Sequence, residues 1–189
     1  MKLLQSGNSK LGAKMLMFNI PAAKEICGRK CPGCYSYKAY KIYPNVLPAQ
    51  QLRYEASQKS TFVNDILLEI KRKRTPFKYI RWHGSAGEFY SQEYIDKVTE
   101  IAKNVPTTTT FYAYTKRIND FDFSTLSALP NFVLINSLQF NKLNYSKLED
   151  APKDVFICPS YKGATCGESC TYCQTKGQAD VKGVWFVKH

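Results

Sequence analysis

Six short apolar segments, rich in β-branched and aromatic residues, recur along the chain between more polar stretches. Segments of this composition and length are typical of buried β-strands. We therefore predict strands at residues 15–20, 79–83, 109–114, 132–138, 155–158 and 184–187.

Two longer segments between these strands carry apolar residues at helical spacing. Residues 49–74 place apolar side chains on one face, with Pro48 at the start and Pro76 just beyond the end. Ser91 is a candidate N-cap for a second helix, which Pro106 stops. We predict shorter helical turns at residues 124–128 and 145–148.

The order of these elements predicts an α/β fold of consecutive βα units around a parallel sheet. A complete eight-unit barrel typically needs about 250 residues, and the chain has 189. We therefore expect a partial (βα)6-like barrel with a cysteine-rich C-terminal extension. Residues 1–150 would form the βα domain, and residues 151–189 would pack on the same domain.

The composition predicts one basic domain with a single hydrophobic core and no membrane-spanning segment. Hydrophobic residues make up 44% of the chain, enough to bury one core. Lys and Arg exceed Asp and Glu by 27 − 15 = 12 charges, which favours nucleic acid, another polyanion or an anionic cofactor; a merely basic surface is the alternative. No apolar run is long enough to cross a membrane and no secretory signal is visible, so we expect a cytoplasmic protein.

Seven cysteines fall into two groups. Three lie at Cys27, Cys31 and Cys34, and four lie at Cys158, Cys166, Cys170 and Cys173. An odd, clustered set in a reducing compartment indicates metal ligands rather than disulfides. Three thiolates on one tight loop suit an iron–sulfur cluster with one open iron better than zinc, which needs a fourth ligand.

The C-terminal group repeats the spacing of the first and adds a fourth cysteine. Four thiolates can close the coordination of an auxiliary [4Fe–4S] cluster or of a tetrahedral zinc, and the repeated spacing favours the cluster. Tyr172 stands directly before Cys173. Because such an aromatic residue also precedes the third cysteine of the family described next, the C-terminal triplet is a rival candidate for the open site.

The first triplet, in a loop after the first strand and before a long helix, resembles the signature of radical S-adenosylmethionine (SAM) enzymes. In that family the open iron binds the amino and carboxylate groups of SAM, and reduction cleaves SAM to a radical that takes hydrogen from a substrate. The segment from His83 to Glu88 resembles the glycine-rich turn of the family, which binds the amino group of SAM. The resemblance therefore implies Ser85, Gly87 and Glu88 as SAM contacts.

Other polar residues are weaker candidates. Asn136, at the end of a predicted strand, could bond a ribose or serve only as a strand-end residue. His83 could transfer protons, but a structural histidine is the favoured interpretation. Tyrosines alternate with Lys38 and Lys41 after the first triplet; they could bind nucleic acid, but packing is favoured. Residues 71–74 form a basic run that suits a solvated helix end.

Two functional hypotheses follow. The first is a possible enzyme: a radical-SAM-like protein with one SAM-type [4Fe–4S] cluster, an auxiliary cluster and an unknown substrate. The alternative is a non-catalytic iron–sulfur or zinc protein that binds nucleic acid or a host protein. The small size, the Cys-Pro-Gly-Cys-Tyr segment and the cysteine-rich tail resemble small bacteriophage proteins, which implies a viral source and the host cytoplasm.

Overall fold

The computed structural model describes most of the chain. The described residues are 2–7, 11–12, 14–28, 34–137, 148–151, 153, 155–175, 184–185 and 187. Of the predicted cysteine ligands, Cys31 lies outside this set.

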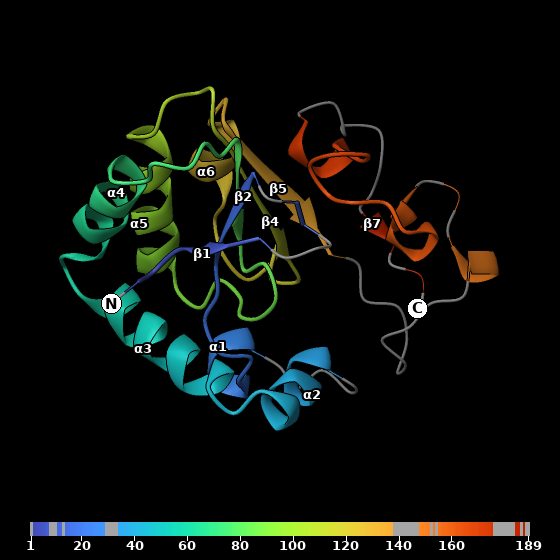
Figure 1. Ribbon diagram of the computed structural model, residues 1–189, viewed down its shortest axis with the longest axis horizontal. Helices are drawn as coiled ribbons and strands as arrows, with labels where there is room; N and C mark the ends of the chain where they lie inside the picture. The colour runs from blue at the N-terminus through green and yellow to red at the C-terminus, as the bar shows by residue number, and fades with distance from the viewer. Residues whose placement is uncertain are drawn as a thin grey trace.

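A five-stranded sheet forms the centre of the molecule. Its strands are β1 (Gln5–Ser6), β2 (Met15–Phe18), β3 (Tyr79–Trp82), β4 (Thr110–Thr115) and β5 (Phe132–Asn136), which lie in this order across the sheet. β1 is antiparallel to β2, whereas β2 to β5 are parallel. Crossover connections between parallel strands are right-handed. When each new strand is added at the same edge of the sheet, all these crossovers lie on one face of it. Accordingly α4 (Phe62–Lys71), α5 (Gln92–Lys103) and α6 (Ser124–Ala128) cover one face of the sheet (Figure 1).

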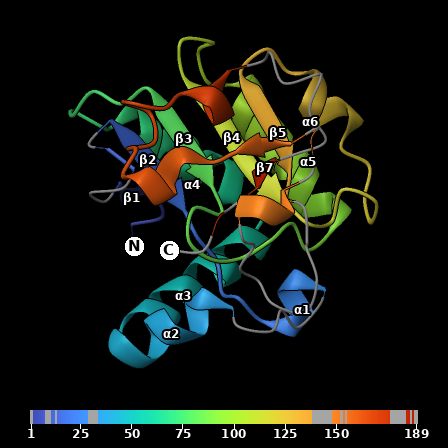
Figure 2. The same ribbon diagram turned by 90° about the vertical axis from the view of Figure 1, so that its right-hand side faces the viewer.

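The alternation of side chains along the strands builds two cores. On the helix-covered face, Phe18, Trp82 and Phe111 pack with α4 and α5. On the opposite face, which we call the helix-free face, the buried core consists of Leu11, Met15, Met17, Tyr79, Tyr112, Val133, Ile135, Cys158, Cys173 and Val184. The C-terminal segment therefore covers the helix-free face, as it does in front of the sheet in Figure 2.

All six predicted strands contain observed strands, but only four of them belong to the parallel sheet. β6 (Phe156–Ile157) and β7 (Val184–Trp185) pair with each other in a separate two-stranded sheet. The mixed α/β class is thus confirmed, whereas the six-unit partial barrel is not. β1 was not predicted because its two residues are polar.

The single helix predicted over residues 49–74 is wrong. The structure has α3 (Val46–Gln58) and α4, separated at Lys59, which adopts an extended backbone. Leu52, which belongs to the predicted apolar stripe, lies in α3 before this break and is 51% exposed. α3 instead buries Arg53, whose Nε donates to the Leu3 carbonyl at 3.0 Å.

The remaining elements are short. α1 (Lys24–Cys27) and α2 (Tyr35–Ile42) flank the first cysteine loop, and 3-10 turns occupy Leu148–Asp150, Pro159–Lys162 and Tyr172–Gln174. α5 begins as predicted, since the Tyr94 amide donates to Ser91 Oγ at 3.2 Å. The turn predicted at residues 145–148 lies almost wholly outside the described residues. Among the described helices, none has the length and apolar character of a membrane span.

Candidate functional site

The segments that follow the parallel strands meet at the carboxyl edge of the sheet, where α/β proteins commonly bind ligands. The His83 amide donates to the Phe18 carbonyl at 2.8 Å, and the Ser85 amide donates to Asn19 Oδ1 at 2.7 Å. These bonds join the turn after β3 to the end of β2. The first cysteine loop leaves the sheet from this same edge.

Two thiols of the first triplet frame the loop between α1 and α2. Cys27 is the last residue of α1, followed by Gly28 in the left-handed conformation (φ 69°), and Cys34 is the N-cap of α2. The Tyr40 hydroxyl accepts from the Ala22 amide at 2.8 Å and donates to Gln50 Oε1 at 2.7 Å. Burial raises the pKa of Tyr40, the hydrogen bond from the Ala22 amide opposes this rise, and the charges of Cys34 and Cys27 add to it.

A hydrogen bond connects this loop to the predicted SAM-binding turn. Ser36, which is buried in the first turn of α2, donates from Oγ to the Ser85 carbonyl at 3.0 Å. The two residues are 49 positions apart in the sequence. The two motifs that were predicted separately thus lie side by side in the structure.

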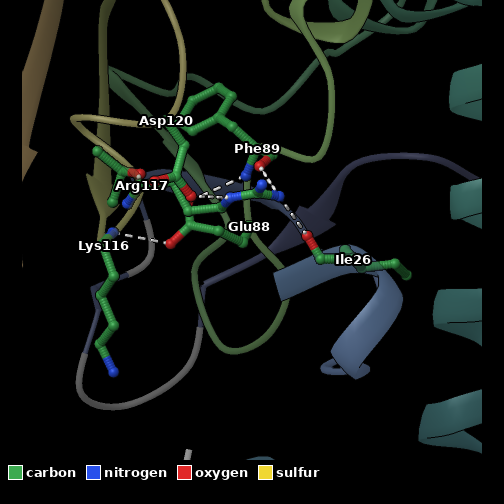
Figure 3. Close-up of polar contacts among 7 residues, drawn as sticks. Ile26, Glu88, Phe89, Lys116, Arg117 and Asp120 are labelled. Carbon is green, nitrogen blue, oxygen red and sulfur yellow. Dashed lines mark hydrogen bonds and ion pairs between the residues drawn. The ribbon is translucent and has the colours of Figure 1, made fainter. Parts of the chain in front are cut away.

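Gly87 and Glu88 have structural roles within this turn. Gly87 has φ +95°, and a Cβ atom there would overlap the Ile20 side chain. Glu88 is 6% exposed, and its two carboxylate oxygens accept from the Phe89 amide at 3.0 Å and the Lys116 amide at 2.9 Å (Figure 3). Burial raises the pKa of the Glu88 carboxyl, and these hydrogen bonds oppose that rise.

Arg117 is a residue of this site that the sequence did not reveal. Its Nη1 donates to the Ile26 carbonyl at 3.3 Å and to the Phe89 carbonyl at 3.2 Å, and its Nε contacts Asp120 Oδ2 at 2.8 Å (Figure 3). A Cβ atom on Gly28 would lie 2.9 Å from the guanidinium carbon. Arg117 therefore fastens the end of α1, next to Cys27, to the residue that follows Glu88.

Two further candidates lie at the same edge. His83 is buried with φ 55°, and its Nε2 lies 3.0 Å from the Tyr94 hydroxyl, which accepts from Trp82 Nε1 at 2.8 Å. Burial lowers the pKa of His83 to about 3, so the ring is neutral near pH 7, as suits a structural histidine. Asn136 ends β5 opposite Thr115 and is half-buried.

The tyrosines after the first triplet divide into two kinds. Tyr40 packs inward through the two hydrogen bonds described above. Tyr37 and Tyr43 are 40% and 61% exposed, and Lys38 and Lys41 are exposed with them. The predicted packing role therefore holds for Tyr40, whereas α2 also presents aromatic and basic side chains to solvent.

The four C-terminal cysteines line one small cavity against the helix-free face. Its volume is about 10 Å³, and its walls are Phe156, Cys158, Pro159, Ser160, Ala164, Cys166, Cys170, Cys173 and Gln174. Cys158 and Cys173 are buried, and Tyr172 stacks on Phe156 with ring centroids 3.5 Å apart. The aromatic residue before Cys173 thus packs locally. Cys166 and Cys170 are half-buried, as are Cys27 and Cys34 of the first group.

Charged and polar groups of the sheet face these thiols. Burial raises the pKa of Cys173 to about 12, and a hydrogen bond from the Tyr114 hydroxyl opposes this rise. Burial also raises the pKa of the Cys166 thiol, while the Arg81 guanidinium lowers it. The Arg81 guanidinium lies over the Tyr114 ring at 4.9 Å from its centroid.

None of the six described cysteines forms a disulfide. Within the described part of the chain, no three Cys, His, Asp or Glu side chains stand close enough to hold a metal ion as they are. For the first triplet this finding leaves out Cys31. For the C-terminal group it means that the thiols would have to move inward to ligate an ion.

Comparison with known proteins identifies a family but no activity. The model of the family described as gene product 88 matches residues 1–156, so the chain belongs to that family. These are phage gene products, which suggests a phage source, and the match gives no indication of the radical SAM superfamily. No curated protein and no solved structure matches the chain. The matched region contains the first cysteine triplet and ends before Cys158.

Proposed function

We propose that this member of the gene product 88 family is an iron–sulfur protein related in function to radical SAM enzymes. Cys27, Cys31 and Cys34 would hold an open [4Fe–4S] cluster, and the turn from Ser85 to Glu88 would lie beside the bound SAM. The observation that carries the proposal is the Ser36–Ser85 hydrogen bond of 3.0 Å, which joins the cysteine loop to that turn.

The donor set and its surroundings fit such a cluster. Thiolates are the usual ligands of iron–sulfur clusters, and three of them leave one iron free for another ligand. Gly28 lets the loop turn directly after Cys27, and the Arg117 guanidinium next to Gly28 supplies a positive charge beside an anionic group. When bound, a reduced cluster would supply an electron to SAM.

The surrounding residues would bind and orient SAM in different ways. Ser85 and Asn136 remain candidates for direct polar contacts. Since both Glu88 oxygens already accept backbone amides, we assign Glu88 to holding the turn in place. The substrate is open; the charge of +12 favours a nucleotide, a nucleic acid or another polyanion. We expect the protein to act in the reducing cytoplasm of a phage host.

The C-terminal cysteines would form a second metal site, with an iron–sulfur cluster and zinc as the two candidate occupants. Their shared cavity supports a common ligand, because four thiols from separate segments face the same space. This second site is a proposal about metal binding alone. It does not depend on whether SAM is cleaved at the first site.

A non-catalytic metalloprotein that binds nucleic acid or a host protein is the second candidate function. It is favoured by Gly87 and Glu88, because packing and backbone hydrogen bonds account for both residues without any ligand. The exposed Tyr37 and Tyr43 next to Lys38 and Lys41 would provide a surface for stacking and phosphate contacts.

Anaerobic purification of the full chain, with iron and sulfide quantification, tests the first candidate. We expect about four iron and four sulfide at the first site, lost in the double variant C27S/C34S and retained in C166S/C170S, which makes the same change at the other group. Reduction with SAM should then release 5′-deoxyadenosine. A first-site cluster that neither binds nor cleaves SAM would favour the second candidate, and a chain without iron would refute the iron–sulfur proposal.

A further inference from the structure

We propose that a groove between α3 and α4, which we call the α3–α4 groove, binds an extended acidic peptide segment of a partner protein, with apolar side chains in the middle of that segment. The inference does not depend on the iron–sulfur function. No cysteine is among the described residues that line the groove, and α4 and β7 lie at opposite sides of the molecule (Figure 1).

One face of α4 forms the longer wall of the groove. This face consists of Thr61, Asp65, Leu68, Glu69 and Arg72. From residue 61 to residue 72 a helix rises about 16 Å, which is the length of about five extended residues. The groove has a volume of about 350 Å³, and ligand sites typically have volumes of about 300–1,000 Å³. Its length and volume therefore suit a short stretch of peptide.

Hydrogen bonds of buried groups hold the facing wall in place. This wall includes Leu3 and Ala56, which are 4% and 8% exposed. The Leu3 carbonyl accepts from Arg53 Nε of α3 at 3.0 Å. The amides of Leu3 and Leu4 donate to the Glu69 carboxylate of α4 at 2.7 Å and 3.1 Å. Because the start of the chain is fastened to both helices, the groove exists before a ligand binds, which lowers the entropic cost of binding.

The two carboxylates of the groove already have partners. Glu69 accepts the two amides just described, and its Oε1 lies 3.7 Å from Lys73 Nζ. Asp65 Oδ2 accepts from Thr61 Oγ1 at 2.9 Å. A donor or a cation beside a carboxylate offsets part of its negative charge. A cationic ligand would therefore have to compete with these partners.

The two cations of the groove have no such partners. Within the described part of the chain, neither Lys59 nor Arg72 forms an ion pair, and both are exposed. Lys59 lies at the break between α3 and α4, whereas Arg72 caps the other end of α4 and belongs to the basic run 71–74. Positive charge thus stands toward both ends of the groove, and it complements a ligand with acidic groups at both of its ends.

The middle of the groove is apolar. Leu68 lies between the two charged ends along α4 and is 47% exposed. An apolar side chain of the ligand that covers Leu68 removes apolar surface from water. Among the described residues that line the groove, none is aromatic, so it offers no ring for the base stacking by which single-stranded nucleic acids bind. An acidic peptide with an apolar centre therefore fits this groove better than a nucleic acid.

Fluorescence anisotropy with the full chain tests the class of ligand. The probe is fluorescein-labelled Glu-Glu-Leu-Leu-Glu-Glu, blocked at both ends, and we expect saturable binding with a Kd below about 1 mM. Glu-Glu-Ser-Ser-Glu-Glu lacks the apolar centre and should bind at least about tenfold more weakly. Lys-Lys-Leu-Leu-Lys-Lys should show no saturable binding. Absence of saturable binding by the first peptide would overturn the proposal.

A matched pair of charge variants tests the location of the site. K59Q/R72Q should weaken binding of the acidic peptide at least about tenfold, whereas K38Q/K41Q removes the same charge from α2 and should change it less than about twofold. All four side chains are exposed, so both variants should keep the parent fold, which circular dichroism checks. Equal weakening by the two variants would indicate a general attraction to the basic chain and would overturn the proposed site.

A matched pair of leucine variants tests the apolar contact. L68S should weaken binding at least about fivefold. L52S changes a leucine of α3 that is similarly exposed, at 51%, but does not line the groove, and it should have little effect. Equal effects of L68S and L52S would overturn the assignment of the apolar contact to the groove. Single-stranded DNA that displaces the peptide from the parent chain but fails to bind K59Q/R72Q would assign the groove to nucleic acid and overturn the peptide proposal.

Discussion

The two cysteine groups share a spacing but occupy different environments. Cys27 and Cys34 flank a loop at the carboxyl edge of the sheet, between two helices and beside the turn after β3. Cys158 and Cys173 are buried against the helix-free face, where the C-terminal segment folds over the strands. The spacing of cysteines in the sequence determines how many thiolates one loop can contribute to a metal site. The residues and charges around the thiolates then determine which metal or cluster they can bind.

The largest expected effect distinguishes the two groups by stability. Replacing Cys173 with Ala removes a proposed metal ligand from a buried site, and we expect a loss of about 3–5 kcal/mol in the free energy of unfolding, since metal binding contributes to folding directly. The same change at Cys27 removes a ligand at the half-buried edge and should cost less than about 1 kcal/mol.

Urea denaturation of both variants, followed by tryptophan fluorescence, measures this difference. The two tryptophans report on both regions: Trp82 is buried in the core of the helix-covered face, and Trp185 is buried in β7, where its carbonyl accepts from the Cys158 amide at 2.9 Å. Equal losses in the two variants would show that the groups contribute alike and would remove the contrast between a structural and a reactive site.

The second prediction compares one glycine from each region. Gly87 and Gly163 both have positive φ, of +95° and +83°, but only at Gly87 does an added Cβ meet neighbouring atoms. We expect G163A to cost about 1 kcal/mol of stability from backbone strain, and G87A to cost about 3 kcal/mol because overlap with Ile20 adds to that strain.

Chemical denaturation of the two variants gives the difference directly, and iron content adds a second measurement. If the turn positions the first cluster, G87A should also lower the iron occupancy of the first site, which is measured in the C166S/C170S background so that the C-terminal group does not contribute. A G87A variant with normal iron would separate the turn from the cluster site and weaken the proposed SAM site.

Several elements of the fold could be predicted from the local sequence, whereas others could not. β2 to β5 were recognisable because their apolar, β-branched and aromatic residues face cores on both sides of the sheet. The departure of β6 and β7 from that sheet was not recognisable, because strand pairing depends on contacts between distant residues. The break at Lys59 likewise depends on how α3 and α4 dock, which a continuous helical pattern conceals.

The candidate site also contains residues that could be predicted from the sequence and residues that only the structure reveals. The cysteine groups and the turn after β3 could be recognised from the sequence because the types and spacing of their residues form motifs. Arg117 was not, because its partners are the carbonyls of Ile26 and Phe89, which carry no sequence signature. Glu88 was assigned to SAM by resemblance, and only the structure shows that the amides of Phe89 and Lys116 occupy its oxygens.

The third prediction concerns this buried carboxyl. The pKa of Glu88 is raised above its ordinary value of 4.5 by burial. A group with a raised pKa in the folded state contributes stability below its unfolded pKa, and this contribution is lost as pH rises through the folded pKa. The stability of the parent chain relative to E88Q should therefore fall as pH increases from below 4.5 toward neutrality.

Urea titrations of the parent chain and E88Q at several pH values measure this change. The control is E55Q on α3. The Glu55 carboxyl is exposed and accepts only a surface hydrogen bond from Gln51 Nε2 at 3.3 Å among the bonds described, so this variant should show no such trend. A relative stability that rises with pH would mean that the amide hydrogen bonds outweigh burial, leaving Glu88 ionised beside the first site.

The smallest expected effect concerns the surface of α2 next to the first group. K38Q/K41Q should change stability by less than about 0.5 kcal/mol because both lysines are exposed. If a nucleic acid binds there, each lost phosphate contact lowers the salt dependence of binding, so the slope of log K against log salt should decrease by about 1.4 to 1.8. Y37A/Y43A should weaken binding of single strands with little change in that slope, because stacking is not a charge interaction.

The control is K71Q/R72Q at the end of α4, where the two side chains are also exposed. It removes the same charge and should leave retention of single-stranded DNA or RNA nearly unchanged if α2 is the contact. Equal weakening by both double variants would indicate a general attraction to the basic chain. Binding lost only in K71Q/R72Q would place the contact at the end of α4, and the proposed nucleic-acid surface on α2 would then be wrong.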